Sequence, residues 1–101
     1  MNVIRYVRMI VSFANGVTED LWINSKSRRV PASIHRVALR KLAQLHFAAG
    51  LDDLRAPPGN RLEALGGDRK GQHSIRINDQ WRICFRWLDD NAHDVEILDY
   101  H

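Results

Sequence analysis

The strongest constraint on the fold is a strict alternation of apolar and polar residues in the last third of the chain. Apolar and polar side chains alternate over residues 73–77 and again over 81–87, with Asn78-Asp79-Gln80 between the two runs. A period of two places successive side chains on opposite faces of a β-strand, and Asn-Asp pairs are typical of turns. The sequence therefore predicts a hairpin with Trp81 and Phe85 on a core face and with Arg82 and Arg86 on the opposite face.

A second periodicity, of three to four residues, predicts one long helix from Pro31 to Ala49. Pro31 suits the first turn of a helix, and Gly50 suits its C-terminal stop. Four shorter elements are also expected: a strand over Met9 to Phe13, a helix from about Glu19 to Asn24 capped by Thr18, a strand near Arg61 to Leu65, and a last strand from Ala92 to Tyr100.

Helices near the start and hairpin-linked strands afterwards indicate an α+β fold. We expect two N-terminal helices packed on one face of a small, mostly antiparallel twisted sheet, which leaves the other face open. A chain of 101 residues has room for one domain. We place this domain at residues 9–101 and treat residues 1–8 as an N-terminal extension without an assigned role.

Composition narrows the classes of protein that need to be considered. The lone Cys84 excludes an internal disulfide, and no Cys or His spacing suggests a zinc site. The first residues are too weakly apolar for a signal peptide or a membrane span, so we expect a cytoplasmic protein. Between Leu21 and Gly50 there are basic residues and no acidic ones: Lys26, Arg28, Arg29, Arg36, Arg40 and Lys41. This positive segment attracts phosphates or an acidic protein, or it is simply a solvated helix face.

Two segments carry a resemblance to a known family. The stretch GDRKGQHSIRINDQWRICFRW and the terminal VEILDYH resemble the HigB branch of the RelE-like toxins, and PPGNRLEALGGDRKGQHSIRINDQWRICF is similar to GraT-type toxins. The resemblance covers roughly Met9 to His101 and implies a RelE-like microbial ribonuclease fold. It also implies a toxin of a type II toxin–antitoxin system that cleaves messenger RNA in the ribosomal A site without a metal or other cofactor.

The resemblance implies partners as well. It indicates a HigA-like helix-turn-helix antitoxin, with operator DNA contacted only through the toxin–antitoxin complex, and no membrane association. A catalytically weak or inactive binding module that acts through contacts with the antitoxin is the alternative. A DNA-binding regulator is disfavoured because the basic helix lacks the preceding helix and tight turn of a helix-turn-helix. A metal nuclease is disfavoured because no carboxylate cluster or His pair has ligand spacing.

Cleavage of RNA without a metal needs a base for the 2′-hydroxyl, a cation for the phosphorane and an acid for the departing 5′-oxygen. The resemblance assigns the cation to Arg82, for which a structural ion pair is the alternative. It assigns a proton-transfer role to His101, which can otherwise be a frayed chain end. Asp99 shares strand parity with His101 and can orient it. Tyr100 points the other way, so it is either a core tyrosine or, if the strand end twists, a residue that stacks on a base or donates a proton.

The general base is unassigned. Relatives often carry a histidine and a lysine before the GDR segment, whereas this chain has Glu63 and Gly66 there. Glu63 is therefore the candidate base, with an exposed strand glutamate as the alternative, and we expect a slower enzyme than its relatives. Four further cations are candidates for holding RNA phosphates around the site: Arg61, Arg69, Lys70 and Arg76.

Overall fold

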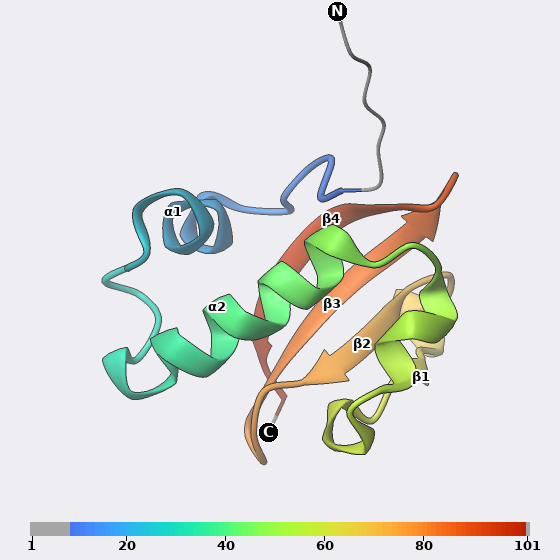
Figure 1. The fold of residues 1–101 in the computed structure, drawn as a ribbon. Coiled ribbons are helices and arrows are strands. Elements are labelled where there is room, and N and C mark those ends of the chain that lie inside the picture. Colours follow the sequence, from blue (N-terminus) through green and yellow to red (C-terminus); the bar gives the residue numbers. More distant parts are fainter. Residues whose placement is uncertain (1–8, 101) are drawn as a thin grey trace, which may run out of the picture.

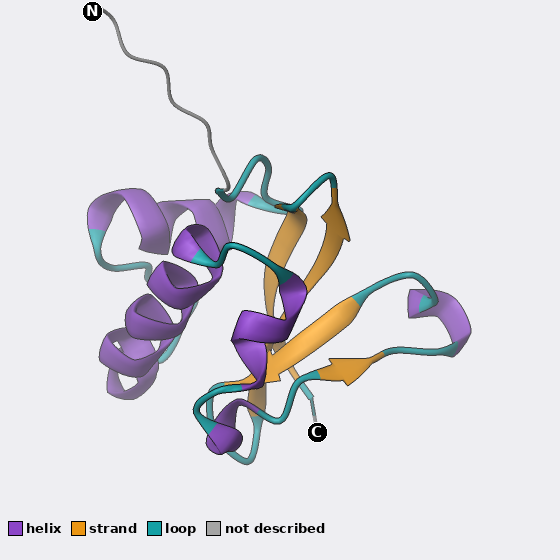
Figure 2. Ribbon diagram, turned by 45° about the vertical axis from the view of Figure 1, so that its right-hand side comes forward, coloured by secondary structure: helices purple, strands orange, loops and turns teal. Residues whose placement is uncertain are grey.

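Helices cover one face of a four-stranded antiparallel sheet in the computed structural model, which describes residues 9–100 (Figure 1). The strands follow the order β1-β2-β3-β4 and are β1 (Glu63–Ala64), β2 (His73–Arg76), β3 (Trp81–Leu88) and β4 (Asn91–Asp99). The α-helices are α1 (Gly16–Asn24) and α2 (Ala32–Phe47), and the short 3-10 helices are η1 (Leu51–Arg55), η2 (Pro58–Asn60) and η3 (Gly67–Arg69). Figure 2 shows the two layers separated, with the β1–β2 hairpin and η3 projecting from the sheet. The predicted fold class is confirmed.

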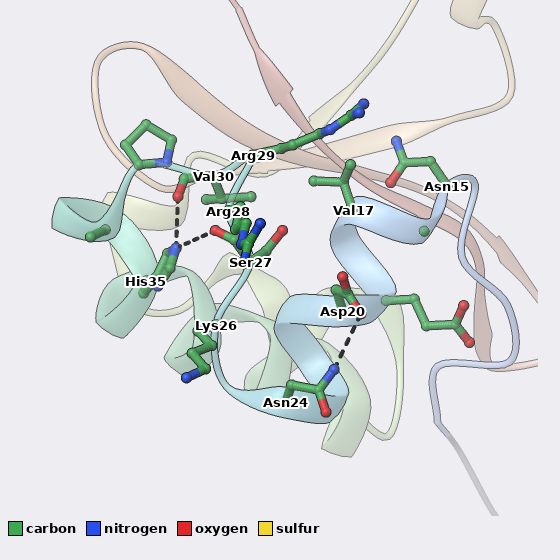
Figure 3. Close-up of a pocket in the computed structure, with 14 residues that line it drawn as sticks. Asn15, Val17, Asp20, Asn24, Lys26, Ser27, Arg28, Arg29, Val30 and His35 are labelled. Atoms are coloured by element: carbon green, nitrogen blue, oxygen red, sulfur yellow. Dashed lines mark hydrogen bonds between the residues drawn. The ribbon is translucent and has the colours of Figure 1, made fainter.

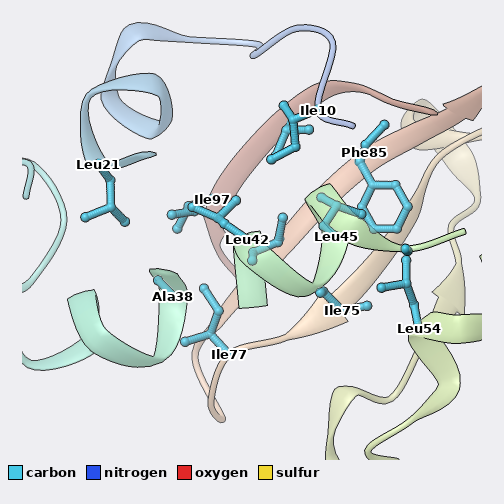
Figure 4. Close-up of a cluster of buried hydrophobic side chains, with 14 of the residues drawn as sticks. Ile10, Leu21, Ala38, Leu42, Leu45, Leu54, Ile75, Ile77, Phe85 and Ile97 are labelled. Atoms are coloured by element: carbon cyan, nitrogen blue, oxygen red, sulfur yellow. The ribbon is translucent and has the colours of Figure 1, made fainter. Parts of the chain in front are cut away.

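The alternation in the sequence determines which face of the sheet is buried. Ile75 on β2 is paired with Ile83 on β3, which in turn is paired with Ile97 on β4, so these apolar side chains form one row toward the helices. Figure 4 shows Ile75 and Ile97 of this row, together with Phe85, beside Leu42 and Leu45 of α2. The opposite face carries Arg82, which therefore lies on the side of the sheet away from α2.

The long helix forms for the reason that the sequence suggests, since its apolar stripe is the part that is buried. Ile34, Ala38, Leu42 and Leu45 are all buried, and full burial of one large aliphatic side chain is worth about 1.5–3 kcal/mol. The helix ends at Phe47, before the predicted Ala49. Its C-cap is Ala48 in an extended conformation, so Gly50 does not cap it and instead precedes η1.

Three local expectations are wrong. The segment from Met9 to Phe13 is not a strand but makes two isolated parallel bridges to β4, because its backbone meets β4 only at two points. The first helix begins at Gly16, and its N-cap is Asn15, whose side chain accepts a hydrogen bond from the Thr18 backbone. Thr18 is instead buried, and its Oγ1 accepts a hydrogen bond from the Ile97 backbone at 3.0 Å.

The predicted strand near Arg61 to Leu65 is reduced to the two residues of β1. The chain is still in the turn after η2 at Arg61 and pairs with β2 only from Glu63 onward. The N-terminal extension, residues 1–8, lies outside the described residues, as does His101. Within residues 9–100, no helix combines the length and the apolar character needed to cross a bilayer.

Candidate functional site

Arg82 is held by acceptors from three different segments of the chain on the face of the sheet opposite α2. Its Nε donates to Ser74 Oγ at 2.8 Å, and its Nη2 donates to the Arg61 carbonyl at 2.7 Å. Nη2 also lies 3.5 Å from Glu63 Oε1. The Arg82 side chain is only 12% exposed, whereas the Glu63 side chain is 54% exposed. The guanidinium therefore has a fixed orientation, with its carboxylate neighbour on the solvent side.

Strand register explains why these groups meet. Ser74 on β2 is the partner of Cys84, two residues beyond Arg82 on β3, so both side chains point to the same face. Glu63 on β1 is paired with Ser74, which brings the carboxylate to the same corner. Arg61 follows η2 in a left-handed conformation with φ of 45°, and this turn precedes β1 directly.

Tyr100 lies beside Arg82 rather than in the core. The Cζ atom of Arg82 lies 5.6 Å from the centre of the Tyr100 ring, and Tyr100 is 42% exposed. Leu98 is paired with Arg82, and Tyr100 is two residues further on, so regular alternation alone places the ring on this face. The expectation that Tyr100 reaches this face only through a twist or bulge is wrong. Asp99 is paired with Trp81 and takes the opposite face, so Tyr100, one residue later, takes the face of Arg82.

Asp99 lies at the neighbouring turn. It is paired with Trp81, and Gln80 Nε2 donates to its carboxylate at 3.0 Å. The relation between Asp99 and His101 falls outside the described residues, because His101 does.

The four additional cations do not form one cluster. Arg76 is the strand partner of Arg82 and pairs with Asp79, while the Arg61 side chain is exposed beside the site. Arg69 is held further along the same face, where its Nη1 lies 3.3 Å from Glu96 Oε1. Lys70 is exposed in the loop after η3. Arg61 and Arg76 thus flank Arg82, whereas Arg69 and Lys70 belong to the projecting hairpin.

Cys84 lies buried between these groups. Burial raises the pKa of its thiol, and Arg69, Glu96 and Arg82 contribute smaller effects of opposing sign. A buried thiol with a raised pKa is a poor nucleophile, so the chemistry of this face depends on its arginines, carboxylate and tyrosine.

Two acceptors for Arg82 were not predicted from the sequence: the Ser74 hydroxyl and the Arg61 carbonyl. Ser74 shares the parity of Arg82 in the alternating pattern, so its place on this face was available from the residues. The Arg61 carbonyl gave no such signal, because a backbone acceptor depends on the course of an irregular turn. No group of three or more His, Cys, Asp or Glu side chains gathers as a possible metal site in the part of the chain that is described.

A separate hollow opens between α1 and the loop that leads into α2 (Figure 3). His35 Nε2 holds this loop by donating to the carbonyls of Ser27 and Val30 at 3.2 and 2.7 Å. Three exposed cations line the hollow: Lys26, Arg28 and Arg29. The predicted positive surface thus exists on the helical layer, although its predicted member Lys41 is buried. None of the described candidate site residues lines this hollow.

At the Arg82 corner, the arrangement suits a phosphodiester of single-stranded nucleic acid. A rigid guanidinium offers hydrogen bonds to phosphate oxygens, and an exposed aromatic ring next to it can stack on a base. A carboxylate beside both can accept a proton from a nearby hydroxyl.

Comparisons with known proteins agree on one family. Residues 11–101 match the family described as RelE-like toxin of type II toxin-antitoxin system HigB. The chain is 43% identical over 85 residues to Toxin HigB-1 of Vibrio cholerae serotype O1, which covers 83% of this chain and 90% of that protein. It is 39% identical over 41 residues to Endoribonuclease HigB of Proteus vulgaris, which covers 41% of this chain and 45% of that relative. A crystal structure of a YafQ variant from E. coli shares the fold, with a TM-score of 0.55 and 16% identity over 92% of this chain and 93% of that chain.

Proposed function

The chain belongs to the HigB-like toxins of type II toxin–antitoxin systems, and from this membership we propose that it is a cytoplasmic endoribonuclease that cleaves messenger RNA on the ribosome. The observation that carries the proposal is the fixed Arg82 guanidinium beside the exposed Tyr100 ring on the sheet face opposite α2. A relative named as an endoribonuclease supports the reaction class.

The reaction that suits this site begins at the 2′-hydroxyl of the message. A base removes the hydroxyl proton, the 2′-oxygen bonds to phosphorus, and the bond from phosphorus to the 5′-oxygen breaks as that oxygen is protonated. We assign the base to Glu63, because its carboxylate lies 3.5 Å from the guanidinium that would hold the phosphate. Arg82 stabilises charge on the phosphorane, and Tyr100 stacks on a base. His101 is the proposed acid and Asp99 the residue proposed to orient it, from the face of β4 opposite to that of Tyr100.

The four remaining cations would hold the flanking phosphates. Arg61 and Arg76 lie next to Arg82 and suit the phosphates nearest the cleaved bond. Arg69 and Lys70, on the projecting hairpin, suit a more distant part of the message or ribosomal RNA. No step in this scheme uses a metal ion.

Cleavage of defined messages on programmed ribosomes tests the proposal. We expect wild-type protein to cut the message and Arg82→Ala to reduce the rate by about 10²–10³, the usual effect of removing one preorganised donor. A message with a single 2′-deoxynucleotide at the cut site should resist cleavage there, because the attacking hydroxyl is missing. Undiminished cutting of the deoxy-substituted message would contradict the mechanism.

We also propose a HigA-like helix-turn-helix antitoxin as the partner, with operator DNA bound only through the complex. Family membership supports an antitoxin as the class of partner. We expect a helix-turn-helix protein to be encoded beside this chain, and co-expression of the two should yield a co-purifying complex. That complex should retard operator DNA, whereas the toxin alone should not; retardation by the toxin alone would contradict this assignment.

The binding-module alternative is favoured by one observation. Arg82 already has three acceptors and little exposure, as a structural ion pair would. Growth arrest separates the two functions, because an enzyme loses toxicity when Arg82 or His101 is replaced by alanine. If both variants fold and still arrest growth, the protein acts by binding.

A further inference from the structure

A buried polar cluster joins α2 to the turn at η2, which precedes β1. Asn60 is fully buried at the end of η2, and its Oδ1 accepts a hydrogen bond from Lys41 Nζ on α2. Its Nδ2 donates to Gln44 Oε1 and to the Leu54 carbonyl, both at 3.1 Å, and to the Ala56 carbonyl at 3.3 Å. One side chain therefore connects a long helix with two points of an irregular segment.

Lys41 is an unusual member of this cluster. It is 5% exposed, and no ion pair joins it to a carboxylate within residues 9–100. Desolvation lowers its pKa, and the nearby Arg40 and Arg76 lower it further. Burial of an ammonium group without a counter-ion is costly, so the fold retains an unfavourable group at this position.

The cluster is connected to Arg82 through one residue of the backbone, Arg61. Asn60 is followed directly by Arg61, whose left-handed conformation turns the chain toward β1, and the Arg61 N–H bonds to the Pro58 carbonyl at 3.1 Å. The Arg61 carbonyl is the acceptor that lies 2.7 Å from Arg82 Nη2. Any rotation of the turn about Asn60 would therefore move one of the acceptors that orient the guanidinium.

We propose that Lys41 and Asn60 are positioning residues for Arg82: they fix the η2 turn so that the Arg61 carbonyl holds the guanidinium in its phosphate-binding orientation. Neither side chain touches the substrate, and both act from the helical side of the sheet. The catalytic consequence rests on the proposed ribonuclease function, whereas the positioning itself is a property of the free protein.

The positioning is tested without substrate by nuclear magnetic resonance of the Arg82 side chain. The Nε–Hε signal of Arg82, assigned by its absence in Arg82→Lys, reports the bond to Ser74 and the orientation of the guanidinium. In Asn60→Ala and Lys41→Met, we expect this signal to shift and its hydrogen exchange to accelerate. The control is Val30→Ala, which removes a buried apolar contact in the α1–α2 loop and should leave the signal unchanged.

Single-turnover cleavage tests the catalytic consequence in the same variants. We expect the maximal rate to fall about tenfold or more, with little change in the protein concentration that gives half-maximal rate, because the guanidinium acts mainly in the transition state. Lys41→Arg retains a charged donor for Asn60 and should recover part of the rate. Val30→Ala should cleave at the wild-type rate.

The outcomes separate the two proposals. If the folded Asn60→Ala and Lys41→Met proteins keep the wild-type Arg82 signal, the positioning role is wrong. A wild-type protein that never cleaves would overturn the proposed function and leave the resonance experiment to decide the positioning. If Asn60→Ala does not fold, the same signal is measured in Asn60→Asp. This variant keeps the acceptor for Lys41 and loses the donors to Leu54 and Ala56. An unchanged Arg82 signal in Asn60→Asp also overturns the proposal.

Discussion

At the scale of single residues, Arg82 shows how a guanidinium can be both fixed and available. An arginine has five N–H donors. Nε is used by Ser74, and Nη2 faces the Arg61 carbonyl and Glu63. The Nη1 group has no such acceptor among the residues from 9 to 100, and in the proposed mechanism this is the group that we expect to bind a phosphate oxygen. The protein thus holds the Nε and Nη2 groups of the guanidinium, while the planar fork keeps Nη1 in a fixed direction.

The role of Glu63 is decided by its amide variant. If Glu63 is the base, Glu63→Gln should lower the maximal cleavage rate by about 10²–10⁴. If the carboxylate is only a counter-ion that the phosphate displaces, the same variant should instead bind the message more tightly and keep its maximal rate. Single-turnover rates on programmed ribosomes over a range of protein concentrations distinguish these results.

Tyr100 allows stacking and proton donation to be separated. Tyr100→Phe keeps the ring and loses the hydroxyl, so it should retain most activity if stacking matters. Tyr100→Ala should weaken message binding by about 1–3 kcal/mol, the range for one base stacked on an aromatic side chain. Binding and cleavage measured for both variants test this assignment. A Tyr100→Phe rate as low as that of Tyr100→Ala would indicate that the hydroxyl donates a proton.

Much of this site follows from the period of two in the sequence. The alternation placed Arg82 on the face opposite Phe85, and extension of the same count from Leu98 would have placed Tyr100 there too. Asn60 and the Arg61 carbonyl could not be found in this way. Their positions depend on an irregular Pro- and Gly-containing turn, for which sequence periodicity carries no information.

At the scale of secondary structure elements, α2 buries a charged residue, Lys41, in addition to its apolar stripe. Periodicity predicted the buried positions of this helix but grouped Lys41 with the exposed cations. Lys41 is instead covered by the segment around η2 and bonded to Asn60. A helical pattern defines which residues share a stripe, whereas the width of the buried face depends on the segments that later pack upon it.

This burial predicts how stability depends on pH. Burial lowers the pKa of Lys41 from its ordinary value of 10.5, so the folded protein loses this proton at a lower pH than the unfolded chain. Between these two pKa values the unfolded chain holds more protons, and the free energy of unfolding should rise with pH. Below the folded-state pKa, the cost of the buried charge is fully present.

Urea denaturation of wild type and Lys41→Met from pH 7 to 10.5 measures this effect. The difference in free energy of unfolding, wild type minus variant, should increase with pH, because the other titrating groups are common to both proteins. Parallel pH profiles for the two proteins would show that Lys41 is well solvated.

At the scale of the whole molecule, the fold was predictable because its two strongest patterns lie on different elements. One helical stripe and one alternating hairpin are sufficient to define two layers. The segment from Met9 to Phe13 was misassigned because a short apolar run does not reveal how many backbone contacts it will make. Its two bridges to Ala92 and Val95 depend on β4, which is distant in sequence.

Cys84 offers a probe of the intact two-layer structure. Its thiol is buried and its pKa is raised, mainly by burial, so the folded protein should react with a thiol reagent at pH 8 slower than the urea-unfolded protein by on the order of a thousandfold or more. Labelling rates followed by mass spectrometry test this expectation. Similar rates in the folded and unfolded protein would mean that the sheet opens readily around β3.

The contacts of β4 have a consequence for synthesis of the protein. Ile10 and Phe13 bridge to β4, and Thr18 accepts its Ile97 N–H, so the beginning of the described chain is anchored by a strand made near its end. Tyr100 also reaches Arg82 only once β4 is in place. A nascent chain that lacks β4 therefore has neither a complete sheet nor an assembled site. During synthesis, the Arg82 site therefore forms only after β4, the last strand of the described chain, has been translated.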